Sequence, residues 1–229
     1  MSVERKRFPD RMHAGYELAQ ELTRFLGGQK PFVLAVPPDG VLVASAIATE
    51  LNVPLDITVS RRMVAPGFPD ETLGAITPDR TLVVNKPLVS RLGLSNQQVE
   101  ELSTPEWVEA QRVMQRYRRG RPYPNLDGYT AVIVDDGLTT GYTVMGAIIS
   151  VRKLEPSSII VAVPVSSLTA MELLRDYVDS LMALEITSAD DYSVAQYYTD
   201  YPEMTEQEVI WTLDRLWNDK VPGGYSETF

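Results

Sequence analysis

The chain has 229 residues, of which 44% are hydrophobic, and this length and composition suit one domain with a sizeable buried core. Its 31 acidic and 21 basic residues give a net charge of −10, which disfavours nonspecific binding to nucleic acid or to an anionic membrane. The chain has no cysteine, which excludes disulfides and thiolate chemistry, and a zinc site would lack partners for His13, the only histidine. No segment reads as a signal peptide or a membrane span, so we expect a cytoplasmic protein.

The first quarter of the chain alternates helix and strand signals. Apolar residues recur every three or four positions over 10–26, which predicts a helix that Gly27 and Gly28 end. This helix contains His13, for which we expect a structural or solvent-facing role. The elements that follow are a strand over 32–36, a turn over 37–40, a helix over 41–51 and a strand over 55–59. This order is typical of a parallel sheet with helices on both faces.

Residues 60–85 are rich in arginine, proline and glycine, which predicts a mobile loop or hairpin with short strands near 73–76 and 81–84. Ser95 and Gln98 then form a capping-box signature.

A charged helix is predicted over 96–118, and Pro105 is expected to interrupt or restart it. The basic run 116–121 is interpreted as a solvated connector, with its arginines reaching a phosphate ligand as the alternative.

The most informative segment is 132–144, which reads VIVDDGLTTGYTV. Asp135 and Asp136 end an apolar, β-branched run, where their carboxylates can accept hydrogen bonds from neighbouring ribose hydroxyls. The turn that follows is rich in threonine and glycine, and its hydroxyls and backbone N–H groups can surround a phosphate at a helix start. The residues assigned to that phosphate site are Gly137, Leu138, Thr139, Thr140, Gly141, Tyr142 and Thr143. This order of acceptors and donors suits a sugar phosphate.

Three other interpretations of this segment are weaker. If the turn were only structural, its polar side chains would cap the next helix, but capping needs one such side chain and the turn supplies five. A dehalogenase-type phosphatase loop needs aspartates two positions apart, and position 137 is glycine. A Walker phosphate loop needs a lysine at a set spacing, and none follows Gly141 there.

The last third of the chain continues the alternation. The predicted elements are an amphipathic helix over 144–154, a strand over 159–165, a helix over 168–178 and a strand over 181–186. Thr205 and Glu208 are expected to open a C-terminal helix, within a C-terminal addition spanning 203–229. Its apolar stripe is interpreted as core, and the tail 221–229 as frayed or as a partner contact.

These features resemble the type I phosphoribosyltransferases, whose donor-binding motif places two acidic residues and a threonine-glycine loop after an apolar strand. The resemblance is long for one branch of that superfamily, usually called predicted phosphoribosyltransferases, and it implies a Rossmann-like parallel sheet within a single domain, 1–229. The matching segments are FPDRMHAGYELAQEL at 8–22, LAVPPDGVLVASAIATEL at 34–51, RRMVAPGFPDETLGAI at 61–76, RYRRGRPYPNLDGYTAVIVDDGLTTG at 116–141 and VAVPVSS at 161–167.

The resemblance also implies roles for these segments. The turn at 37–40 corresponds to a pyrophosphate loop, which presents N–H groups through an often unusual peptide geometry, and basic residues of a mobile loop at 61–74 screen the pyrophosphate. The acidic pair would hold the ribose hydroxyls, and Mg²⁺ would bridge those hydroxyls and pyrophosphate, so that the carboxylates meet the metal only indirectly. The residues concerned are Pro38, Asp39, Gly40, Arg61, Arg62, Asp135 and Asp136.

One position departs from the branch, which commonly has arginine-glycine-glycine where this chain has Pro38-Asp39-Gly40. An aspartate beside pyrophosphate would repel it unless a magnesium ion lay between them. Asp39 therefore either recruits metal or weakens the site, and a plain tight turn is the third interpretation.

The leading prediction is a Mg²⁺-dependent phosphoribosyltransferase of nucleotide metabolism, which moves a phosphoribosyl group from 5-phosphoribosyl 1-pyrophosphate to a nitrogenous base and releases pyrophosphate. The acceptor is open, and Tyr192, Tyr197 and Tyr198 either stack on a base or pack. The alternatives are a noncatalytic sensor of phosphoribosyl pyrophosphate or a nucleotide, which Asp39 motivates, and an unrelated doubly wound hydrolase with a metal on its acidic pair. The oligomeric state is open: family members often pair, so a homodimer is one alternative. No nucleic-acid or membrane partner is expected.

Overall fold

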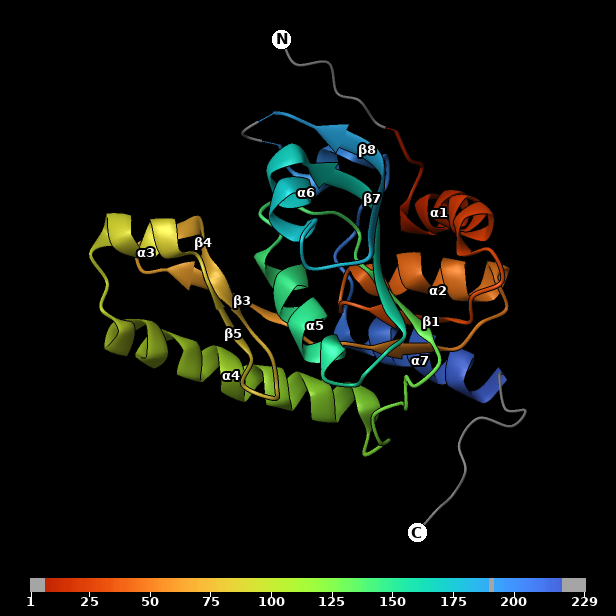
Figure 1. The fold of residues 1–229 in the computed structure, drawn as a ribbon, viewed down its shortest axis with the longest axis horizontal. Coiled ribbons are helices and arrows are strands. Elements are labelled where there is room, and N and C mark those ends of the chain that lie inside the picture. The colour runs from red at the N-terminus through yellow and green to blue at the C-terminus, as the bar shows by residue number, and fades with distance from the viewer. Residues whose placement is uncertain (1–6, 190–191, 220–229) are drawn as a thin grey trace.

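A five-stranded parallel sheet forms the centre of the computed structural model, which describes residues 7–189 and 192–219 (Figure 1). Every neighbouring pair of strands in this sheet is parallel. The strands, in spatial order, are β2 (Leu55–Ile57), β1 (Pro31–Ala35), β6 (Thr130–Val134), β7 (Ser158–Ser167) and β8 (Ser180–Thr187). The predicted α/β fold with a parallel sheet is therefore confirmed.

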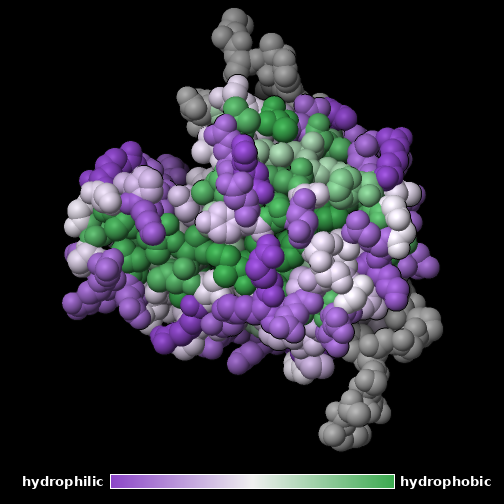
Figure 2. Space-filling view, viewed as in Figure 1, coloured by the Kyte–Doolittle hydropathy of each residue, from purple (hydrophilic) through white to green (hydrophobic). Residues whose placement is uncertain are grey.

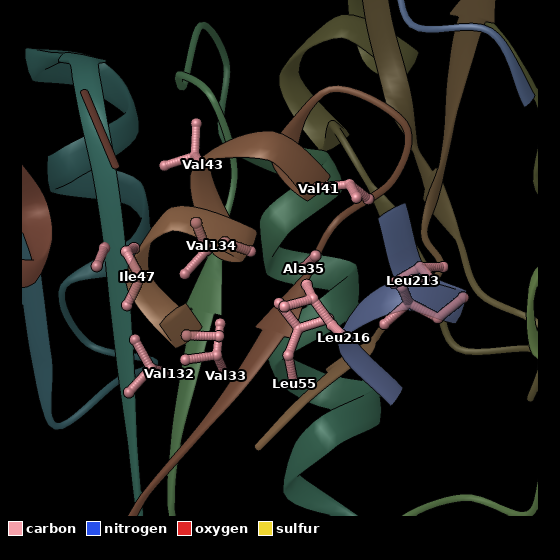
Figure 3. Packing of buried hydrophobic residues seen from close by; sticks show 14 of the residues in the cluster. Val33, Ala35, Val41, Val43, Ile47, Leu55, Val132, Val134, Leu213 and Leu216 are labelled. Carbon is pink, nitrogen blue, oxygen red and sulfur yellow. The ribbon is translucent and has the colours of Figure 1, made fainter. Parts of the chain in front are cut away.

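Helices cover both faces of this sheet because successive strand residues point to opposite sides. One face packs against α1 (Arg11–Leu26), α2 (Gly40–Glu50) and α7 (Glu206–Asp219). Figure 3 shows this core, with Val33 of β1 and Val132 of β6 beside Ile47 of α2, and Leu216 of α7 near Leu55. The other face is covered by α5 (Tyr142–Arg152) and α6 (Leu168–Leu174).

The predicted helix boundaries follow from local capping. The side chain of Asp10 accepts a hydrogen bond from the His13 N–H, and α1 ends at Gly27 in the left-handed conformation. The exposed His13 ring contacts Asp10, as expected for a solvent-facing residue. At the start of α7, Thr205 and Glu208 bond reciprocally, and the apolar stripe of this helix is core as predicted.

The longest helix, α4 (Asn96–Arg118), begins at the predicted capping box of Ser95 and Gln98. The expectation that Pro105 interrupts it is wrong, because the helix continues through this residue. Packing holds both sides of the proline in place: Val99 is buried, and the Trp107 indole N–H donates to the Pro78 carbonyl at 3.0 Å.

Residues 61–118 form a second layer beside the main sheet, which we call the hood, and the C-terminal half of α4 also packs into the main core (Figure 1). The interpretation of 60–85 as a loop or hairpin is incomplete, since an antiparallel sheet in the order β3-β4-β5 occupies this segment. Figure 2 shows hydrophobic residues gathered between the polar outer surfaces of the hood helices. The hood contains β3 (Arg61–Ala65), β4 (Phe68–Ile76), β5 (Leu82–Val84), α3 (Lys86–Leu92) and α4 around a core that includes Met63, Leu73, Leu88 and Val99.

The basic run 116–121 is more than a solvated connector. Arg118 is buried, and its guanidinium lies 2.5 Å from the buried carboxylate of Asp56 in β2. Arg116 and Arg119 pair with Glu206 and Asp214 of α7. These arginines fasten the end of α4 to β2 and α7, and Arg118 is not available to a phosphate.

Within the two described ranges, the helices are all too short or too polar to cross a membrane.

Candidate functional site

A cavity of about 250 Å³ lies where the carboxyl ends of β1 and β6 meet the first residues of the hood. Parallel strands end at the same sheet edge, so the turns that follow β1 and β6 lie side by side. We call this space the acidic cavity because three aspartates border it. Its lining residues are Val36, Pro37, Pro38, Asp39, Ser60, Arg61, Arg62, Asp135, Asp136 and Thr143. The structure thus brings together the predicted pyrophosphate turn, acidic pair and arginines.

The turn between β1 and α2 packs tightly on the end of β6. The peptide bond between Pro37 and Pro38 is cis, the kind of unusual geometry that the resemblance implies. A Cβ atom at Gly40 would lie 2.7 Å from the Val134 carbonyl oxygen and 2.9 Å from the Cα of Asp135, so only glycine fits here. Gly40 therefore supports the cavity from behind rather than lining it.

The two acidic residues of the pair differ in their surroundings. Asp136 is 5% exposed, and its Oδ2 accepts hydrogen bonds from Arg11 Nε at 2.9 Å and from the Tyr201 hydroxyl at 2.6 Å. Asp135 is half-buried, and its Oδ1 accepts the Asp136 N–H at 2.9 Å. Asp135 therefore keeps acceptor capacity for a ligand, whereas one oxygen of Asp136 is already engaged by protein donors.

Burial governs the charges of these acids. It raises the pKa of Asp135 well above its usual range, and the negative charge of Asp136 raises this pKa further. Burial also raises the pKa of Asp136, although the hydrogen bonds from Tyr201 and Arg11 oppose the shift. The pKa of Asp39 is raised by burial and by the charge of Asp136, and Arg11 opposes it. The cavity therefore favours a cationic or hydroxyl-bearing ligand next to the carboxylates.

Arg11 is a site residue that the sequence prediction missed. It is 2% exposed at the start of α1, and its Nη2 lies 2.8 Å from Asp39 Oδ1. The sequence did contain a signal for this role, because Arg11 falls on the same helix face as the apolar residues Ala14 and Leu18. A charge buried on that face would be costly unless it had a partner.

The two predicted arginines enter the cavity from β3. Arg61 pairs with Glu106 of α4 at 3.1 Å, which limits its freedom. Arg62 is more exposed, and its Nη2 donates to the Pro69 carbonyl at 2.9 Å. Ser60, just before them, is a second missed residue, with a buried Oγ that finds no hydrogen-bond partner among the described residues. Arg62 is the cation of this pair with more freedom to meet a ligand.

The threonine turn opens mainly onto a larger neighbouring space of about 970 Å³, which we call the outer cavity. Thr139, Thr140 and Tyr142 line the outer cavity, Thr143 lines the acidic cavity, and Arg62 borders both. Helix α5 starts directly after this turn with no side-chain cap, so its first N–H groups suit an anion.

Three predicted residues of this turn have structural roles. Gly141, at φ 79°, takes the left-handed conformation before α5. The Leu138 N–H donates to the Val165 carbonyl at 2.9 Å, and a Cβ at Gly137 would lie 2.7 Å from the Val194 side chain. Gly137, Leu138 and Gly141 are not among the described residues that line either cavity, and they shape the turn instead.

The three predicted tyrosines have different positions. Tyr198 is 2% exposed, its ring packs on Phe8, and its hydroxyl donates to the Asp136 carbonyl at 2.7 Å. Tyr192 lines the outer cavity and donates to the Leu138 carbonyl, and the Tyr197 ring lies edge-on to it. Packing is thus the role of Tyr198, and Tyr192 is the tyrosine of the three that borders a cavity.

A divalent cation would find an incomplete set of protein ligands here. Over residues 7–189 and 192–219, no three histidine, cysteine or acidic side chains converge closely enough to hold a metal ion. Carboxylate oxygens are the ligands that Mg²⁺ prefers, and Asp135 offers one such group. The residues therefore fit Mg²⁺ only if the ligand supplies most of the coordinating oxygens.

Comparison with known proteins agrees with this geometry. The model of the phosphoribosyl transferase domain matches residues 6–201. Proteins named "Putative phosphoribosyl transferase" in two strains of Mycobacterium tuberculosis are 35% identical over 219 residues, which is 96% of this chain and 49% of each relative. The chain thus spans about half the length of these curated relatives. The crystal structure of TT1426 from Thermus thermophilus is 34% identical, with a TM-score of 0.75 over 92% of this chain and 99% of that one. The chain therefore belongs to the phosphoribosyl transferase domain family.

Proposed function

We propose that the protein binds 5-phosphoribosyl 1-pyrophosphate across the two cavities and transfers its phosphoribosyl group to a nitrogenous base. The observation that carries this proposal is the acidic cavity, where the pyrophosphate turn, the acidic pair and two arginines converge from β1, β6 and β3. In this arrangement Asp135 accepts hydrogen bonds from the ribose hydroxyls. Thr139, Thr140 and the uncapped start of α5 hold the 5′-phosphate.

Transfer of the phosphoribosyl group requires the stabilisation of two developing charges. Positive charge grows on the ribose ring as the bond to pyrophosphate breaks, and the nearby Asp135 carboxylate stabilises it. Negative charge grows on the departing pyrophosphate, where Arg61 and Arg62 at the other wall of the cavity stabilise it. Mg²⁺, when bound, would neutralise the leaving group, and Asp135 would hold it only through ribose hydroxyls or water.

The acceptor is assigned to the same outer cavity that receives the 5′-phosphate at Thr139 and Thr140, and this cavity adjoins the acidic cavity at Arg62. Its lining is mostly uncharged, with hydroxyl and amide groups such as Thr72, Asn85 and Ser167 beside Tyr142 and Tyr192. Such a lining suits a planar polar base, which a few hydrogen bonds and an aromatic contact can orient. Because joining a phosphoribosyl group to such a base forms a nucleotide, the proposed reaction belongs to nucleotide metabolism.

The test is to mix the purified protein with 5-phosphoribosyl 1-pyrophosphate, Mg²⁺ and a panel of nucleobases, and to follow pyrophosphate release. Release that depends on one base supports the transferase. The absence of both donor binding and release would overturn the proposal.

The second candidate is a noncatalytic sensor of the same donor or of a nucleotide. Two observations favour it: Asp39 places an acid in the pyrophosphate turn, and Pro37 and Pro38 supply no N–H donors there. Tight donor binding without pyrophosphate release across a broad panel would identify the sensor.

A further inference from the structure

Arg11 joins the two turns that border the acidic cavity. Its Nη2 lies 2.8 Å from Asp39 Oδ1, in the turn after β1, and its Nε lies 2.9 Å from Asp136 Oδ2, in the turn after β6. A planar guanidinium fixes the directions of its donors, so one side chain sets the spacing of these two carboxylates. Because Arg11 is only 2% exposed, its guanidinium interacts with protein groups rather than with solvent.

The remaining donors of Arg11 hold it against the segment before α7. Its Nη1 donates to the Pro202 carbonyl at 2.7 Å, and its guanidinium carbon lies 3.7 Å from the centre of the Tyr201 ring. The Tyr201 hydroxyl donates to the same Oδ2 of Asp136 at 2.6 Å. Asp136 is therefore held by two donors from elements far apart in the sequence.

Backbone pairing fixes Tyr201 in turn. The Phe8 N–H donates to the Tyr197 carbonyl at 2.9 Å, and the Thr199 N–H donates back to the Phe8 carbonyl at 2.9 Å. The Tyr198 ring packs on both Phe8 and Tyr201. This segment and the start of α1 thus form one rigid support behind the acidic pair.

The positive charge of Arg11 affects how pyrophosphate meets Asp39. Asp39 occupies the position at which an acid would repel pyrophosphate, and its neighbouring cation is Arg11. With Arg11 in place, the negative charge of Asp39 is offset at close range, although the 39% exposure of the Asp39 side chain lets water screen part of this attraction.

We propose that Arg11 is a positioning residue that couples the two turns. It neutralises Asp39 so that pyrophosphate can bind, and together with Tyr201 it fixes Asp136 so that Asp135 is the carboxylate offered to the ribose. The inference rests on the proposed function, because it assigns the two turns to the two ends of the same donor.

The test at the pyrophosphate end is a double-mutant cycle between Asp39→Asn and Arg11→Met. Binding of inorganic pyrophosphate with Mg²⁺ is measured by calorimetry for both single variants, the double variant and the wild-type protein. Asp39→Asn alone should change the dissociation constant by less than about threefold, because Arg11 already compensates the charge. Arg11→Met should weaken binding by about tenfold or more, and adding Asp39→Asn should recover at least about fivefold of this loss.

The test at the ribose end is Tyr201→Phe, with ribose 5-phosphate as the probe. This variant keeps the ring under Arg11 and removes only the hydroxyl that donates a hydrogen bond to Asp136. Binding of ribose 5-phosphate should weaken by about fivefold, while pyrophosphate binding stays within about twofold of wild type. Tyr177→Phe, at an exposed tyrosine outside both cavities, is the matched control and should change neither.

Thermal unfolding of each variant separates positioning from folding. A purely structural role would lower the melting temperature and weaken both probes in parallel, and that result would overturn the inference. Additive effects in the cycle would also overturn it. If Arg11→Met does not fold, the other variants still decide, because a more than tenfold gain in pyrophosphate binding by Asp39→Asn alone would contradict neutralisation by Arg11. A wild-type protein that binds neither probe would overturn the proposed function together with the inference, whereas binding without coupling would overturn the inference alone.

Discussion

Arg11 Nε lies 2.9 Å from Asp136 Oδ2, although the two residues are 125 positions apart in the chain. This contact divides the acidic pair into two roles. Asp136 is fixed by protein donors and shapes the turn, while Asp135 faces the cavity with free acceptor capacity. Through this contact, Arg11 on the buried face of α1 places its positive charge at the edge of the sheet where phosphoribosyl transfer is proposed.

This division predicts different outcomes for the two asparagine variants. Asp135→Asn should reduce donor turnover by about 100-fold or more, because it removes the charge nearest the developing cation. The same variant should raise the melting temperature at pH 7, because burial disfavours the ionised carboxylate. Since the folded-state pKa is raised, the destabilisation that Asp135 causes should grow as the pH rises from its unfolded pKa to its folded pKa, and should vanish at pH values below its unfolded pKa. Unfolding curves at several pH values check this.

Asp136→Asn is the matched comparison. It leaves the buried Arg11 with a weaker acceptor, so it should lower the melting temperature where Asp135→Asn raises it. Equal effects of the two variants on stability would contradict the division of roles.

Arg62→Gln should weaken pyrophosphate binding and slow donor turnover by about tenfold, because Arg62 borders both cavities and is exposed. Arg91→Gln, at a hood arginine paired with Glu71 outside the cavities, should leave both unchanged. Pyrophosphate titrations and turnover assays provide the comparison. Equal losses in the two variants would assign the effect to general hood charge rather than to the site.

Gly40→Ala should destabilise the protein by about 1–3 kcal/mol and remove donor binding, because the new Cβ would clash with the backbone of Val134 and Asp135. Gly67→Ala, in the hood turn between β3 and β4, meets no atom within 4 Å and carries only the strain of its positive φ. Denaturant unfolding with donor titration distinguishes the two. Normal donor binding by Gly40→Ala would show that the turn can move away from β6.

Asp79 links the hood to the end of α5 through Lys153 at 2.7 Å. Burial opposes its ionisation, but hydrogen bonds from Lys153, Thr77 and Thr81 outweigh burial and lower its pKa to about 2. The stabilisation is therefore present above the unfolded pKa and is lost as the pH falls from about 4 towards 2. Asp79→Asn should cost about 1 kcal/mol at pH 7, allowing for partial exposure, and much less near pH 2.

Acid and denaturant unfolding measure this difference. Asp176→Asn, at an exposed acid with only a long contact to Arg175, serves as the control and should have little effect at either pH. A loss for Asp79→Asn that is the same at both pH values would contradict the assigned linkage.

Local patterns predicted the parts of the fold that local forces determine. Ser95 and Gln98 cap α4 as their spacing indicates, and Thr205 opens α7 because its hydroxyl and Glu208 satisfy the first N–H groups. The parallel sheet followed from alternating strand and helix signals. The acidic pair was recognisable because its motif, from the apolar strand to the threonine turn at 132–144, is contiguous in the sequence.

The remaining features depend on contacts between distant residues. The hood sheet was read as a loop or hairpin because its core forms only when Met63 and Leu73 meet α4. Pro105 remained helical because packing on both sides of it overrides the proline penalty. The partnership of Arg11, Asp136 and Tyr201 joins three regions of the chain, and no spacing rule within one segment could have paired them.

The most direct measurement is a crystal structure of the protein with 5-phosphoribosyl 1-pyrophosphate and Mg²⁺. The account predicts the ribose hydroxyls at Asp135, the 5′-phosphate at the start of α5, and pyrophosphate between the turn at Asp39 and Arg62. A donor bound elsewhere, or an acidic cavity that stays empty at saturating donor, would contradict it.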